Sequence, residues 1–243
     1  MSAAVSDLIS VWVPTSPSPR HPSTELLELA IESVRTHLPN VEVIVQMDGI
    51  RPENENRREA YTEYKRRVAT LCSTKYVGVI PLEFAEFSHQ AEMARATFPL
   101  TTKPLLLYFE WDWILLDRPI DWQAMATAIL MGQLNHIRIC RWEEIHPAHV
   151  HLMDGYEVID GCPVTKTHQW SGHPALASTE FFKRIIGMFR PGCRTLIEEF
   201  IYGPVATSPW EAYRCAVYSP EGGYRRIEHT DGREGDPKFP AQF

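Results

Sequence analysis

The sequence has few cysteines and no long hydrophobic run. Its five cysteines lie far apart, without a C-x-x-C pair, at Cys72, Cys140, Cys162, Cys193 and Cys215. This spacing excludes a dense disulfide framework and favours reduced thiols. No apolar run reaches the ~20 residues of a membrane span, and residues 1–14 lack the basic start and apolar centre of a signal peptide. We therefore expect a cytoplasmic protein without a membrane span.

Positive charge is also scarce, since 24 Lys and Arg residues stand against 31 Asp and Glu residues, a net charge of −7 over 243 residues. This balance argues against a broad surface that follows nucleic-acid phosphates. Three familiar signatures are absent as well: the phosphate loop G-x-x-x-x-G-K-[ST], G-x-G-x-x-G after the first strand, and G-x-S-x-G. Their absence weakens kinase, dehydrogenase and serine-hydrolase interpretations.

An alternation of strand and helix patterns is present instead. Residues 8–13 and 41–47 are apolar, β-branched strand candidates, and a helix from about Ser23 lies between them with a buried stripe at Leu27, Ile31, Val34 and Leu38. A strand, a helix and a strand in this order predict a βαβ unit with a parallel sheet.

Further elements follow along the chain, and no repeat or low-complexity linker interrupts them. Helices are predicted within 53–71, 87–97, 122–134, 179–188 and 194–202, strands over 76–82, 104–113, 136–140, 164–170 and 213–218, and a loop from 221 onward. The length and the 44% hydrophobic content suit one α/β domain.

The apolar run of residues 104–113 delivers two carboxylates to its end. If the strand continues, Glu110 and Asp112 share one face, while Trp111 and Trp113 take the other. Like charges at such positions repel each other, and a bound Mg²⁺ or Mn²⁺ would neutralise them. The alternative is two acids that simply point into solvent.

Three predicted strands end in residues suited to ligand binding: Thr15 in Pro14-Thr15-Ser16, Asp48 before Gly49, and the Glu110-Trp111-Asp112 motif. Ligands of open parallel sheets bind beyond the carboxyl ends of strands. This order of elements resembles the nucleotide-sugar glycosyltransferases of the GT-A fold, and the family-2-like enzymes among them, over roughly the first 140 residues. The resemblance implies a single GT-A-like domain with a mostly parallel, Rossmann-like central sheet flanked by helices. Residues 1–140 would form the donor-binding half, and residues 141–243 the acceptor-binding and C-terminal half.

The resemblance also implies roles for individual residues. Thr15 would touch the nucleoside, although two prolines in its loop depart from the usual pattern, and Asp48 would contact the base or ribose of the donor. Asp112 would bind the metal, and Glu110 a ribose or a water. A Mn²⁺ or Mg²⁺ ion bridging the two phosphates would neutralise the leaving nucleoside diphosphate. Taken by itself, without the resemblance, the position of Asp48 favours a turn residue after a strand.

Two further groups come from the second half of the chain. His229 resembles the C-terminal histidine that completes the metal site in many enzymes of this fold, and Arg225 and Arg226 could cover the diphosphate. The alternative for all three is plain solvent exposure.

An inverting transferase also needs a carboxylate base. Glu198 and Glu199 lie near the start of a predicted helix and are the candidates, with Glu199 slightly favoured and Glu180 in reserve. Trp170 lies in a Gly- and Pro-bearing loop that suits stacking against a sugar or base, although a packed tryptophan explains it as well.

The sequence thus predicts a metal-dependent glycosyltransferase that moves a hexose from a nucleoside diphosphate sugar to an acceptor hydroxyl, with inversion. The acceptor stays open: a saccharide, a lipid, a protein, a small molecule, or a hydroxylated DNA base as in phage enzymes. One rival is a phosphoesterase or nucleotidyltransferase that combines the two acids with His146, His149 and His151. Another is a non-catalytic nucleotide-sugar-binding module.

Overall fold

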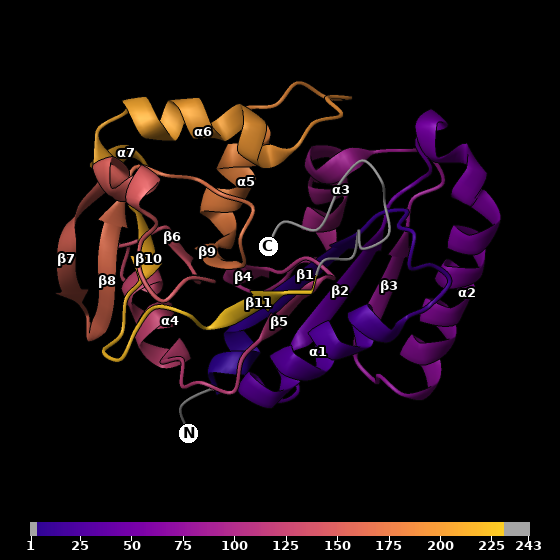
Figure 1. The fold of residues 1–243 in the computed structure, drawn as a ribbon, viewed down its shortest axis with the longest axis horizontal. Coiled ribbons are helices and arrows are strands. Elements are labelled where there is room, and N and C mark those ends of the chain that lie inside the picture. The colour runs from indigo at the N-terminus through magenta and orange to yellow at the C-terminus, as the bar shows by residue number, and fades with distance from the viewer. Residues whose placement is uncertain (1–3, 231–243) are drawn as a thin grey trace.

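The computed structural model describes residues 4–230, which form a nine-stranded sheet covered by helices on both faces (Figure 1). The strand order is β3-β2-β1-β4-β9-β6-β10-β8-β7, and a small second sheet pairs β11 with β5. None of the helices in this part of the chain is both long and apolar enough to cross a membrane.

The N-terminal half alternates strands with helices, as predicted. Its strands pair in parallel, β1 with both β2 and β4, and β2 with β3. The elements in chain order are β1 (Ile9–Thr15), α1 (Glu25–His37), β2 (Glu42–Met47), α2 (Arg58–Thr74), β3 (Val79–Glu83), α3 (His89–Thr97) and β4 (Leu105–Tyr108).

The later half of the chain forms the other side of the sheet, coloured from magenta-rose through orange to yellow in Figure 1. Only β8 and β9 run against the remaining seven strands, so the prediction of an α/β domain with a mostly parallel central sheet is confirmed. The elements are β5 (Trp113–Leu115), α4 (Trp122–Leu130), β6 (His136–Arg138), β7 (Met153–Ile159), β8 (Cys162–Thr167), β9 (Ala175–Ser178), α5 (Thr179–Gly187), α6 (Ile197–Thr207), α7 (Trp210–Tyr213), β10 (Cys215–Tyr218) and β11 (Ile227–His229).

Alternation along the central strands builds a core on each face of the sheet. On β1, Val11 and Val13 pack into the core that also contains the buried stripe of α1, while Trp12 points to the opposite core with residues of α3, α5 and α6. Because every residue of β1 is buried, the strand reads as a continuous apolar run in the sequence.

The strand predicted over 104–113 is wrong in its second half. β4 ends at Tyr108, the Phe109 N–H makes a last bond to the carbonyl of Trp12, and a turn leads into β5, with the Trp113 N–H bonded to the carbonyl of Glu110 at 3.2 Å. Glu110 and Asp112 therefore lie in a turn and do not share a strand face.

Four strands were not predicted, namely β5, β7, β9 and β11. The segment from residue 221 was expected to be a loop, but β11 pairs there with β5. Strand β9 is short and alanine-rich, so it carries little β propensity. The β7–β8 hairpin turns at Asp160 and Gly161, whose φ values of 49° and 79° suit a type I′ turn.

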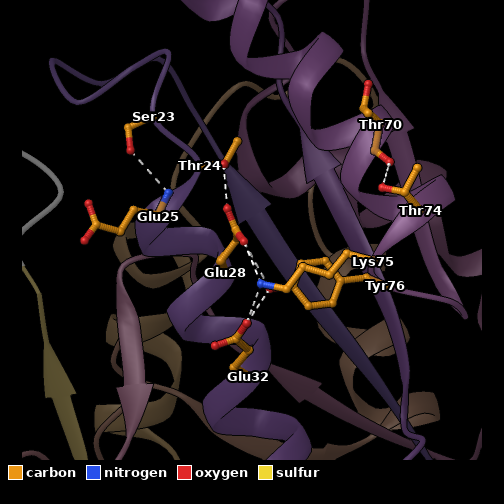
Figure 2. A network of polar contacts seen from close by, with 9 residues as sticks. All are labelled: Ser23, Thr24, Glu25, Glu28, Glu32, Thr70, Thr74, Lys75 and Tyr76. Carbon is orange, nitrogen blue, oxygen red and sulfur yellow. Dashed lines mark hydrogen bonds and ion pairs between the residues drawn. The ribbon is translucent and has the colours of Figure 1, made fainter.

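Figure 2 shows a polar network that fastens the end of α2 to α1. The Lys75 ammonium lies 2.8 Å from Glu28 and 2.7 Å from Glu32, and the Tyr76 hydroxyl donates to Glu32 at 2.8 Å. Partial burial pushes the pKa of Glu28 up, but hydrogen bonds from Lys75 and Thr24 outweigh it, so the pKa lies below its usual 4.5. Hydrogen bonds from Lys75 and Tyr76 likewise lower the pKa of Glu32.

Replacement of Lys75 by Gln should lower the free energy of unfolding only slightly, because the pairs are largely exposed and screened by solvent. Since both glutamate pKa values are lowered by folding, this contribution is present above pH 4.5 and is lost as pH falls through the lowered values. Urea unfolding at pH 7 and pH 3 measures it, with Lys183→Gln, at an exposed position of α5, as control. An equal loss at both pH values, or no difference from the control, would contradict the assignment.

Candidate active site

The carboxyl ends of β1, β2 and β4 meet at one edge of the sheet, as the parallel pairing requires. Thr15 ends β1 and is buried, with its hydroxyl 3.4 Å from that of Tyr61. Asp48 follows β2, and its N–H donates to the carbonyl of Thr15 at 3.1 Å. The motif with Glu110 and Asp112 follows β4, so this edge gathers the polar groups expected there.

Asp48 is buried and organises backbone. Its carboxylate accepts N–H bonds from Gly49 at 2.7 Å, Ser88 at 2.7 Å and His89 at 3.0 Å. Burial raises the pKa of Asp48 above its usual value, although these three bonds act in the opposite direction. The structure thus gives Asp48 a role in fixing the start of α3, and its contact with a nucleotide stays a prediction.

Asp112 and His229 lie together, although they come from distant parts of the chain. The Asp112 Oδ2 atom is 3.3 Å from Nε2 of His229, which lies on β11 opposite Trp113 of β5. Both the N–H and the hydroxyl of Thr230 donate to the backbone carbonyl of Asp112, at 2.8 and 2.7 Å. Pairing of β5 with β11 therefore brings the two predicted metal ligands together.

The chemistry of this pair fits a divalent cation. Asp112 is 7% exposed, and its Oδ1 atom is buried without a hydrogen-bond partner among residues 4–230. A buried carboxylate oxygen without a partner carries a free-energy cost that a cation would remove. No cluster of three His, Cys, Asp or Glu side chains suited to a metal occurs within the described residues. Among the described residues, Asp112 and His229 could therefore offer two ligands at most, and any others would have to come from substrate oxygens or water.

Gln90 connects the acidic motif to helix α6. Its Nε2 donates to Glu110 Oε1 at 2.7 Å, and its Oε1 accepts the N–H of Ile197, the first residue of α6, at 3.2 Å. One side chain therefore sets the separation between the motif and the helix turn that carries Glu198 and Glu199.

The two candidate bases point in different directions. Glu198 lines a cavity, and its Oε2 accepts the Gly172 N–H at 2.8 Å. The Glu199 carboxylate instead accepts the Thr195 hydroxyl at 3.3 Å, and Glu199 does not line this cavity. The slight preference for Glu199 stays untested, but the geometry favours Glu198.

The cavity beside Glu198 has an aromatic lining. Tyr108, His136, Trp170, His173 and Phe182 contribute to its wall. Trp170 is buried and stacks on His136, with ring centroids 4.4 Å apart, so one of its faces is already covered. Burial lowers the pKa of both His136 and His173 to about 3, so both rings are neutral at pH 7.

Trp113 connects this cavity with the Asp112–His229 pair. Its ring centroid lies 4.6 Å from that of His229 and 5.1 Å from that of His173. The Asp112–His229 pair and the cavity that Glu198 lines therefore belong to one region of the molecule.

The remaining candidates lie elsewhere or are already engaged. Arg225 pairs with Glu228 at 3.3 Å, and Arg226 is buried, with its guanidinium donating to the backbone carbonyls of Pro119, Gly223 and Arg225. Glu180 lines a different cavity with residues 101–104.

The loop with three histidines is exposed at His146 and His151 and half-buried at His149. The Nδ1 atom of His146 accepts the Ala148 N–H at 3.2 Å, and that of His149 lies 3.4 Å from Gln169 Nε2. Within the described part of the chain these histidines belong to no three-ligand group, so the geometry gives no support to a metal site there.

No protein-family model and no curated protein matches the sequence. Solved structures do match. GalNAc-T7 with UDP, GalNAc and Mn²⁺ has a TM-score of 0.60 at 11% identity, over 93% of this chain and 44% of that one. S. aureus TarS 1-349 in complex with UDP-GlcNAc has a TM-score of 0.56 at 13% identity, over 91% and 60%. The mannosyltransferase PcManGT from Pyrobaculum calidifontis, in complex with GDP-Man and Mn²⁺, has a TM-score of 0.50 at 14% identity, over 89% and 58%.

This chain has the GT-A fold. It spans about half the length of those solved chains, and the low identities establish the fold alone. The resemblance inferred from Thr15, Asp48 and the acidic motif is thereby confirmed at the level of architecture.

Sequence reasoning missed several residues of this GT-A site. Gln90 gave no signal, since a glutamine at the start of a helix is ordinary, and its two partners come from the turn after β4 and from α6. The cavity also depends on His136 and Phe182, which lie on β6 and α5. Of the residues lining this cavity, the sequence indicated Glu198 as a candidate base and the loop at Trp170, where Gly172 and Pro174 follow an aromatic residue.

Replacement of Gln90 by Leu should free the Ile197 N–H and raise its hydrogen-exchange rate about 5-fold, because one hydrogen bond of ~1 kcal/mol is lost. Exchange measured by NMR reports this amide directly. Gln123→Leu on α4 is the matched control and should leave the rate unchanged. Equal exchange at Ile197 in wild type and Gln90→Leu would show that Gln90 does not hold α6.

Proposed function

We propose that this chain is a metal-dependent glycosyltransferase that moves a hexose from a nucleoside diphosphate sugar to an acceptor hydroxyl, with inversion. The observation that carries the proposal is the Asp112–His229 pair with its unpartnered buried oxygen, placed beyond the carboxyl end of β4. The GT-A fold supports it, because three matched structures carry UDP-GlcNAc, GDP-Man with Mn²⁺, or UDP with GalNAc and Mn²⁺.

Asp112 and His229 would hold Mn²⁺ or Mg²⁺, and the Oδ1 atom of Asp112, which has no hydrogen-bond partner among the described residues, would be available as a ligand. The ion, when bound, supplies positive charge against the diphosphate leaving group. Thr230 keeps the Asp112 backbone in place, since two of its donors bind one carbonyl. Gln90 holds the carboxylate of Glu110, two residues before Asp112, and we assign Glu110 to a ribose hydroxyl or a water.

Glu198 is the base that we assign to the acceptor hydroxyl. Inversion by direct displacement requires a carboxylate that removes the hydroxyl proton as the sugar is attacked. Glu198 lines the aromatic cavity and lies in the first turn of α6, which Gln90 ties to the acidic motif.

We assign the two substrates to the two halves of the chain. Residues 1–140 carry Thr15, Asp48 and the acidic motif, and we assign the donor to this half. Residues 141–243 carry Glu198 and the loop at Trp170, and we assign the acceptor to them. Arg225 could reach the diphosphate only if it left its ion pair with Glu228.

Release of nucleoside diphosphate from a panel of nucleotide sugars, with and without Mn²⁺, tests the reaction. Glu198→Gln should reduce transfer or donor hydrolysis by about 10²–10⁴-fold, the range typical of a general base, while Mn²⁺-dependent donor binding persists. Glu199→Gln is the matched control and should stay close to wild type.

Three results would contradict parts of the proposal. Full activity of Glu198→Gln would exclude Glu198 as the base. Loss of activity in Glu199→Gln alone would transfer the role to Glu199. Donor binding without metal dependence and without turnover would favour a nucleotide-sugar-binding module.

A further inference from the structure

Arg138 carries its charge in a buried position and forms no ion pair with an acid among residues 4–230. The residue is 6% exposed, and it ends β6 on the face of the sheet that also bears His136. Its Nη1 donates to Gln169 Oε1 and to Ser171 Oγ, both at 3.0 Å and both neutral. Its Nε is buried without a hydrogen-bond partner among the described residues.

Such a guanidinium is costly, because burial removes water and no ion pair within the described residues replaces it. Glu198 lies close enough to act on Arg138 electrostatically, but its carboxylate accepts the Gly172 N–H and forms no ion pair with the arginine. Arg226, equally buried, shows the contrast, since its guanidinium donates to three backbone carbonyls.

A second arginine lies three residues further on. Arg141 is half-buried, stacks over the Trp142 ring at 4.0 Å, and takes part in no ion pair within residues 4–230. Both arginines act electrostatically on His173, which lines the cavity with Glu198. Ser171, which accepts a hydrogen bond from Arg138, and His173, on which both arginines act, line this cavity, so both cations lie near it in a chain whose net charge is −7.

We infer that Arg138 and Arg141 bind an oxyanion, a phosphate or carboxylate group carried by the acceptor. Guanidinium groups bind both kinds of oxyanion through paired N–H donors, and an unused Nε is one such donor. Ser171 touches Arg138 and lines the same cavity as Glu198, so the anion would lie near the hydroxyl to be activated. The assignment of the anion to the acceptor rests on the proposed transfer reaction, whereas the anion site itself does not.

The donor diphosphate is a weaker candidate for this position. In the proposed reaction the diphosphate binds the metal held by Asp112 and His229. The ring of Trp113 packs on His229 and on His173, and His173 is the residue on which both arginines act, so two aromatic rings lie between His229 and the arginines. An anionic group on the acceptor satisfies the arginines without displacing the donor.

Thermal unfolding of the full chain, without donor or divalent metal, tests the anion site. Sodium phosphate and sodium acetate are each compared with sodium chloride at equal ionic strength. An anion at about five times its Kd should raise the Tm of the wild type by roughly 2–4 °C. A rise with phosphate alone identifies a phosphate site, and a rise with acetate alone identifies a carboxylate site.

Arg138→Met should abolish this rise and, without anion, should be as stable as the wild type or more stable, because the uncompensated charge is removed. Arg226→Met is the matched control: it should unfold at lower temperature, because its three carbonyl bonds are lost, and should keep the rise. Arg141→Met should reduce the rise and serves as the second variant should Arg138→Met fail to fold.

The inference is overturned if neither anion shifts the wild type beyond sodium chloride. It is also overturned if Arg138→Met keeps the full rise, or if Arg141→Met keeps it when Arg138→Met cannot be examined. Because no sugar transfer is measured, an anion-dependent rise in a chain without transferase activity would leave the site standing and remove only its assignment to an acceptor.

Discussion

The buried Asp112 carboxylate is the constraint on which the rest of the site depends. Its backbone carbonyl is bound twice by Thr230, one oxygen lies beside His229, and the other has no partner in the described residues. This arrangement exists only because β4 stops at Tyr108 and the chain turns into β5, which pairs with β11. A longer β4 would hold Asp112 on a strand and away from the histidine.

Much of the N-terminal half follows from local pattern. Buried parallel strands such as β1 and β2 are continuous apolar runs, and α1 carries a clear apolar stripe, so strand, helix and strand could be predicted. The end of β4 could not be predicted, because it depends on pairing with β1: the last hydrogen bond between the two strands runs from the Phe109 N–H to the Trp12 carbonyl. Strand β11 escaped prediction for a similar reason, since it exists through pairing with β5.

In the site, too, some features could be predicted from the sequence and others required the fold. Asp112 and His229 were found through family resemblance, and the structure brings them within 3.3 Å. The distinction between Glu198 and Glu199 needed the fold, because adjacent helix positions point in different directions and only the location of Gly172 shows which one faces the cavity. Likewise, the buried charge of Arg138 indicates an anion site only because its hydrogen-bond partners, Gln169 and Ser171, are neutral, and the sequence does not show these contacts.

The most direct measurement is the anomalous scattering of manganese in crystals grown with Mn²⁺ and a nucleoside diphosphate. The account predicts one strong peak in contact with Asp112 Oδ1 and His229 Nε2, and no such peak in Asp112→Asn. A peak at the loop of His146, His149 and His151, or an unchanged peak in the variant, would contradict it.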